Sequence, residues 1–181
     1  MANVDNPHGL VPVRHLLGCC ITSNLYHVDS SNDTAIFRGD VIKLEDDGNI
    51  APADATDVNL IGVAIACYDL NKSPISTNGG RLAASTEGYI DVVDDPYVLF
   101  ECQGDGVDAA TQVGTNADIV ATTGSTTTGI SAHELSTAGI GAGTAQLRVY
   151  GIYDTPNNAW GANTRQLVLI NEHLFKSTTG I

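Results

Sequence analysis

Positive charge is scarce in this sequence: eight Lys and Arg stand against 21 Asp and Glu, which gives a formal net charge of −13. Affinity for the phosphate backbone of nucleic acid comes mainly from clustered Lys and Arg, and anionic membrane surfaces attract the same side chains. We therefore expect no nucleic acid and no membrane among the partners of this protein.

Long apolar runs are missing as well. No stretch approaches the roughly 20 apolar residues that a transmembrane helix needs. The opening MANVDNPHGLVPVRHLLGCC has no basic segment followed by an apolar one, which is the pattern of a secretory signal peptide. We therefore expect a chain that is made in the cytosol.

Cysteine and aromatic residues are also few. The four cysteines, Cys19, Cys20, Cys67 and Cys102, include no C-x-x-C pair, so free thiols are expected and a structural zinc site is not. Aromatic residues make up 6% of the chain, with a single tryptophan at position 160. A glycan hydrolase needs aromatic platforms for sugar beside its two carboxylates, so this class of enzyme has little support.

Catalytic motifs are absent too. The five histidines show neither H-E-x-x-H nor H-x-x-x-H spacing, no G-x-S-x-G elbow is present, and the glycine-rich stretch 139–143 lacks the lysine of a phosphate-binding loop. A Ser-His-Asp triad built from distant parts of the chain stays open, because its members need not be near in sequence. We expect no enzyme and no cofactor.

Acidic residues gather between 91 and 108, where six carboxylates fall within eighteen residues: Asp91, Asp94, Asp95, Glu101, Asp105 and Asp108. The alternatives are a catalytic pair, a calcium site and the exposed rim of a sheet. Asp-Asp-Pro at 94–96 is typical of a turn, and Asp91 and Glu101 stand at outward-alternating strand positions. The stretch 104–108 matches one turn of a calcium-binding β-roll, a motif that works by stacking and occurs once here. We expect exposed acids with no metal and no catalytic role.

The sequence does contain many short apolar runs separated by Gly, Ser, Thr, Asn and Asp. Strand patterns cover seven runs: 24–28, 36–44, 60–68, 88–93, 97–103, 145–153 and 166–170. The run 60–68 is almost entirely apolar, so we expect it in the middle of the core with both faces buried. In 145–153, Leu147 and Val149 alternate with Arg148 and Tyr150, which predicts a half-buried strand.

These runs predict an all-β protein, a compact antiparallel β-sandwich or barrel, with helix limited to a turn or two near 131–136. We expect an extended N-terminal arm at 1–20 and a single β-rich domain at 21–181. Glycine and small polar residues fill 121–131 and 136–146, which predicts a long Gly/Ser/Thr-rich loop that is either flexible or held by a partner.

The N-terminal arm carries the residues that we expect at an interface. Its proline spacing and its lack of strand alternation suggest that 2–16 is extended and lies on a neighbouring chain. Arg14 is a rare cation in an acidic chain and therefore suits an interfacial carboxylate. The alternative is an arm that folds back on its own domain. The candidate contact residues are Leu10, Val11, Pro12, Val13 and Arg14.

Several blocks of the sequence resemble one protein family. They are DNPHGLVPVRHL, IGVAIACYD, DVVDDPYVLFECQ, VGTNADIVATTGSTTTGIS and RVYGIYDTPNNAWGANTRQLVLINEHLF. In this order, and over most of the chain, they are similar to the capsid decoration (head cement) proteins of tailed bacteriophages. The resemblance implies a β-rich virion protein that is assembled in the host cytoplasm. It would bind the major capsid protein on the outer surface of the head, commonly as a homotrimer, and reinforce capsomer junctions.

Two other functions stay open at this point. One is a trimeric receptor-binding or fibre-type β module of the tail, although the sequence has neither a repetitive shaft nor a coiled-coil segment. The other is a glycan hydrolase that uses two of the acids between 91 and 108, which the low aromatic content disfavours.

Overall fold

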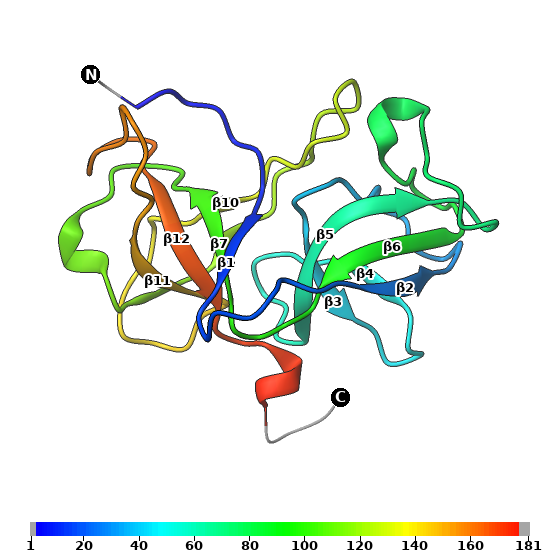
Figure 1. Cartoon of the computed structure of the whole chain (residues 1–181), viewed down its shortest axis with the longest axis horizontal. Coiled ribbons are helices and arrows are strands. Elements are labelled where there is room, and N and C mark those ends of the chain that lie inside the picture. The colour runs from blue at the N-terminus through cyan, green and yellow to red at the C-terminus, as the bar shows by residue number, and fades with distance from the viewer. Residues whose placement is uncertain (1–2, 178–181) are drawn as a thin grey trace.

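The computed structural model describes residues 3–177 and consists of two five-stranded antiparallel sheets with a small two-stranded one between loops (Figure 1). The first sheet has the order β1 (Val11–His15), β7 (Val98–Gln103), β12 (Arg165–Ile170), β11 (Leu147–Ile152) and β8 (Asn116–Ala117). The second has the order β2 (Asn24–Val28), β6 (Gly88–Val93), β5 (Leu60–Tyr68), β3 (Val41–Leu44) and β4 (Ile50–Pro52). The all-β, sandwich-like prediction is confirmed, and the alternative of a closed barrel is wrong.

The remaining elements are short. Strands β9 (Ile119–Val120) and β10 (Glu134–Leu135) form the small sheet, and the helical content is limited to the 3₁₀ turns η1 (Asn78–Gly80), η2 (Ala110–Gln112) and η3 (Leu174–Lys176). The helical turn that we expected near 131–136 is therefore wrong, since β10 lies there. The predicted run 36–44 also shortens to β3, because Asp40 and Gly39 make a tight turn in which the Asp40 carboxylate accepts from the Phe37 amide at 2.8 Å.

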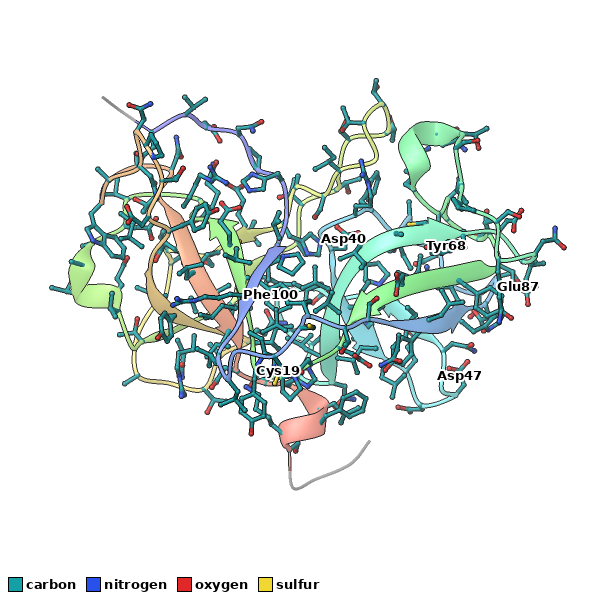
Figure 2. All side chains as sticks on the ribbon, viewed as in Figure 1. Cys19, Asp40, Asp47, Tyr68, Glu87 and Phe100 are labelled. Atoms are coloured by element: carbon teal, nitrogen blue, oxygen red, sulfur yellow. The ribbon has the colours of Figure 1, made fainter. Side chains whose placement is uncertain are left out.

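Two apolar cores lie on the two faces of the second sheet. One fills the space between the sheets around Phe100, which stands near the middle of Figure 2. The other lies on the opposite face of the second sheet, around Ile42 and Ile90. Strand β5 supplies both, with Leu60 and Val63 in the first core and Ile61 and Ala64 in the second. The expected burial on both faces is thus confirmed for 60–64, whereas the end of the strand at 65–68 is partly exposed. The first sheet has one face that looks outward.

The N-terminal segment is part of the chain's own fold. Strand β1 pairs antiparallel with β7, so 11–15 lies on its own domain, as in the alternative that the sequence left open, and its contact with a neighbouring chain stays a prediction. The alternation was hidden by Pro12, which an edge strand tolerates, and by a register shift between Pro12 and Arg14. Upstream, the Asn3 side-chain amide donates to the carbonyls of Ala159 and Ala162 at 2.8 Å.

The Gly/Ser/Thr-rich loops are also fixed by the chain itself. The main chain of Arg38 donates to Gly129 at 3.1 Å and accepts from Ser131 at 2.8 Å, which ties 121–131 to the turn before β3. A Cβ on Gly129 would lie 2.0 Å from the Gly79 carbonyl oxygen, so only glycine allows this close approach. In 136–146, Gly141 exchanges both main-chain hydrogen bonds with Asn116. From composition alone, we predicted that these segments are either flexible or held by a partner.

Candidate interaction face

The outward face of the first sheet gathers cations and apolar side chains. Alternation along the strands turns Phe100, Val149 and Val168 into the core and the intervening residues outward. We call this surface the arginine face and define it by Val11 and Arg14 of β1, Arg148 and Tyr150 of β11, and Arg165 and Leu167 of β12. It holds three of the eight Lys and Arg of the whole sequence.

The five residues predicted for an interface do not share one environment. Leu10 is 1% exposed and belongs to the core between the sheets, and Pro12 stands opposite the buried Phe100, so neither offers an outward contact. Val11 is 42% exposed and Arg14 is exposed, and both point outward. Val13 lines a shallow depression of about 350 Å³ together with Arg14, Tyr150, Asp154 and Leu167.

Each arginine of the face is oriented by a neighbour. The Arg14 guanidinium lies over the Tyr150 ring at 5.7 Å from its centre, and Arg148 donates from Nε to the Asn116 side-chain oxygen at 2.9 Å. Both contacts leave the positive charge uncompensated, because a ring and an amide are neutral. Arg165 differs, since its Nε donates to Glu101 Oε1 at 2.6 Å. The face therefore carries two cations, Arg14 and Arg148, that are positioned but not neutralised.

Glu101 is the carboxylate at the centre of this sheet, and its side chain is only 2% exposed. It bonds Arg165 on one oxygen and His8 Nε2 on the other at 2.8 Å. Burial works to raise the pKa of Glu101, but the hydrogen bonds from His8 and Arg165 outweigh it and lower that pKa, while the same contact raises the pKa of His8. Our expectation that Glu101 belongs to a wet rim is wrong. It is a fixed anion held between two donors, not a proton acceptor for chemistry.

The turn acids are likewise less exposed than the sequence predicts. Asp94 is 8% exposed and accepts from the Tyr26 hydroxyl at 2.6 Å and from the Asn24 amide at 2.9 and 3.1 Å. Asp95 bonds His15 Nε2 at 3.0 Å. These carboxylates fasten β2 and β1 to the turn between β6 and β7, so the predicted exposed corner is a structural junction. Sequence reasoning missed this because the partners lie about 70 to 80 residues away in the chain.

The glycine-rich stretch 104–108 does not bring its acids together on one ligand. Asp105 accepts from the Thr137 amide and hydroxyl at 2.7 Å each. Asp108 is 2% exposed beside the fully buried Gln166, and burial raises its pKa to about 6. Within residues 3–177, no group of three His, Cys, Asp or Glu side chains is placed to hold a metal ion.

One set of side chains in the described residues is a candidate for the Ser-His-Asp triad that the sequence leaves open, namely Ser131, His133 and Asp40. His133 Nε2 lies 3.5 Å from Asp40 Oδ1, and its Nδ1 accepts from the Val41 amide at 3.3 Å. The Ser131 hydroxyl oxygen accepts from the His133 main-chain amide at 3.0 Å, and the side chain that this hydroxyl contacts is that of Asp40 and not the imidazole ring. Burial raises the pKa of Asp40 and lowers that of His133. Because both ring nitrogens face other groups, this set lacks the nucleophile–base contact that a triad requires.

The cysteines are distributed as two exposed and two buried thiols. Cys19 and Cys20 lie in the exposed segment after β1, and Cys67 and Cys102 lie in strands, where burial raises the pKa of both thiols, that of Cys67 to about 11. Such thiols are poor nucleophiles at neutral pH, because the thiolate is the reactive form. The buried pair fills core positions, as its apolar strand context predicts.

The described residues contain no helix that is long and apolar enough to span a membrane. No family model, no curated protein and no solved structure matches the chain.

Proposed function

We propose that this chain is a structural virion protein that binds the outer surface of a tailed-phage capsid as a homotrimer and reinforces capsomer junctions. The proposal starts from the sequence blocks that resemble head cement proteins. The observation that carries it is the arginine face, an outward sheet surface with exposed Val11 and Tyr150 beside two unneutralised cations. Exposed apolar area next to oriented arginine is the composition of a protein-binding surface, and a decoration protein that acts as a homotrimer needs such a surface between its own copies.

The body that presents this face is suited to a mechanical role. Two cores share one sheet, the long loops are tied to the chain, and the N-terminal segment is a strand rather than a loose end. A rigid clamp across neighbouring capsomers opposes their separation by adding buried interface, and several weak contacts on one particle act together. The acidic remainder of the surface suits the outside of a head better than the side that faces DNA.

The two alternatives lack an observation that favours them. For a hydrolase, two of the acids between 91 and 108 would have to face each other across a cleft, yet Asp94 is saturated by donors and Glu101 is locked between His8 and Arg165. For a tail module, the fold offers neither a shaft nor a coiled coil in residues 3–177. Position in the particle separates the tail from the head.

The decisive experiment is to locate the protein on particles. Purified protein is added to empty heads of the phage that encodes it, the heads are sedimented, and bound copies are counted against the major capsid protein before electron microscopy. We expect binding that saturates at several copies for each capsomer, and electron density on the outside of the shell between neighbouring capsomers. Density on the tail, or no density on the particle together with no binding to heads, would refute the proposal.

A further inference from the structure

The second sheet ends in a surface of opposite charge. Five acidic residues, Asp29, Glu45, Asp46, Asp47 and Glu87, lie at the turn between β3 and β4 and at the neighbouring ends of β2 and β6. We call this surface the acidic end. The Asn49 amide donates to Asp29 and Asp47 at 3.3 and 2.8 Å, and His27 bonds Asn49 and Glu87, which shows that these segments meet.

The acidic end lies far from the arginine face. Asp47 and Glu87 stand at the right-hand end of the molecule in Figure 2, whereas the first sheet occupies the left-hand side of Figure 1. Asp46 and Asp47 are exposed. Of the lysines nearby, Lys43 is paired with Asp57 at 3.2 Å, and Lys72 lies over the Tyr89 ring at 5.0 Å from its centre. The two surfaces therefore carry opposite charge, with Arg14 and Arg148 on the arginine face and exposed carboxylates at the acidic end.

We infer that the arginine face of one copy binds the acidic end of a second copy of this chain. The occupant is assigned by charge complementarity: Arg14 and Arg148 lack a carboxylate partner within the described chain, and the acidic end supplies several exposed carboxylates. Val11 at 42% and Tyr150 at 45% exposure provide apolar area that such contact would cover. This contact would join the subunits of the proposed homotrimer. Only the number of copies, three, rests on the proposed function.

Charge also disfavours contact between like surfaces. Two arginine faces brought together would oppose Arg14 and Arg148 to their own copies, and two acidic ends would oppose carboxylates, which costs free energy in either case. The remaining arrangement joins unlike surfaces. Such a contact is heterologous, and it closes into a ring when the rotation between copies allows it.

Charge reversal tests the contact without any capsid. Variant A carries Arg14→Glu and Arg148→Glu, variant B carries Asp46→Lys and Asp47→Lys, and the control carries Arg38→Glu, which makes the same kind of charge change off both surfaces. Sedimentation velocity at low ionic strength measures association. We expect the wild type and the control to associate, and variants A and B each to associate about tenfold or more weakly.

Mixing the variants makes the test specific. In an equimolar mixture, the acidic end of A meets the intact arginine face of B, and the reversed end of B meets the reversed face of A. Pairs of A and B should therefore form, whereas a ring of three always keeps one A–A or B–B junction of like charge and should not close. Each variant is checked for an unchanged circular dichroism spectrum and melting temperature. A monomeric wild type, association of A equal to that of the wild type, or a mixture that stays dissociated would overturn the inference. Binding to heads is scored separately, so failure here leaves the decoration proposal with its own test.

Discussion

At the scale of single residues, the acidic side chains of this protein fall into two groups, exposed and buried. Exposed carboxylates such as Asp46 and Asp47 set the net charge, whereas Asp94, Glu101 and Asp108 are buried and take part in the fold. Sequence spacing treats both kinds alike, because a turn signal such as Asp-Asp-Pro says nothing about what packs on it. The identity of the donors, and not the number of acids, decides which carboxylates matter for stability.

The clearest residue-scale prediction concerns Asp94. In Asp94→Asn, one oxygen becomes an amide that faces the Asn24 amide or the Tyr26 hydroxyl, so a buried donor loses its acceptor. We expect a loss of about 1–3 kcal/mol in the free energy of unfolding, measured by urea denaturation. The matched control is Asp46→Asn, an exposed acid, for which we expect a change within about 0.5 kcal/mol. Equal effects of the two substitutions would contradict the junction that we describe.

Asp108 predicts a specific dependence of stability on pH. Its folded pKa is raised to about 6, above the value of about 3.9 expected in the unfolded chain. Between these values the folded state binds more protons than the unfolded state, so this group's contribution to stability falls as pH rises from about 4 to about 6.

In Asp108→Asn that contribution is removed. We expect the variant to gain about 1–3 kcal/mol relative to the wild type between pH 4 and pH 7, with a flat difference above pH 7. Urea midpoints across this pH range measure it, and comparison of the two proteins cancels the titration of the His8–Glu101 pair. A difference that does not change with pH would rule out the raised pKa.

At the scale of elements, the predictions from sequence succeeded where a strand is long and failed where it is short or interrupted. Runs 24–28, 60–68 and 88–93 match β2, β5 and β6 to the residue, because five or more residues carry a readable pattern. Strands of two or three residues, such as β8 and β10, carry none. Their pairing depends on distant partners, and a single sequence does not contain that information in any local pattern.

The residues of the arginine face were predicted on different grounds. Alternation in 145–153 predicted a half-buried strand with Arg148 and Tyr150 on one side, and both are exposed. Val11 and Arg14 were chosen because the arm looked irregular, and they point outward for the different reason that β1 pairs with β7. Nothing in the sequence indicated that β1 and β11 contribute to one face, because the sheet order places β7 and β12 between them.

Strand β1 supplies an element-scale prediction with a built-in control. Leu10 is 1% exposed in the core and its neighbour Val11 is 42% exposed on the arginine face. We expect Leu10→Ala to cost about 2–4 kcal/mol because it leaves a cavity, and Val11→Ala to cost less than about 1 kcal/mol. Urea denaturation measures both. Nearly equal costs would mean that the N-terminal segment does not lie on the first sheet in solution.

At the scale of the whole molecule, the second sheet separates two apolar cores and contributes side chains to both. Either core loses one side if this sheet opens, because Leu60 and Val63 project into one and Ile61 and Ala64 into the other. The two apolar clusters therefore depend on each other, although they are separate in space. The single β-rich domain that the sequence predicts for 21–181 stays a prediction, which this dependence makes testable.

A calorimetric scan tests this mutual dependence. We expect one unfolding transition whose calorimetric enthalpy equals its van't Hoff enthalpy, since neither core retains its packing without the shared sheet. Dilute protein and raised salt keep the chain monomeric during the measurement. Two transitions, or a van't Hoff enthalpy well below the calorimetric one, would show that the cores unfold independently.

The shared sheet has a further consequence for how the chain finds its alignment. In a strand with one wet face, a slip of one residue puts apolar side chains into water, and this penalty selects the right pairing. Residues 60–64 of β5 lack that safeguard, because their side chains enter an apolar core on either side. Gly62 provides a different constraint on the register. A Cβ at this position would lie 2.1 Å from the Val93 carbonyl oxygen. Only a residue without a side chain can therefore face Val93 of β6, and Gly62 is the one glycine in β5. Steric exclusion at Gly62 thus fixes the pairing register of β5, which in ordinary strands is fixed by the difference between a buried and a wet face.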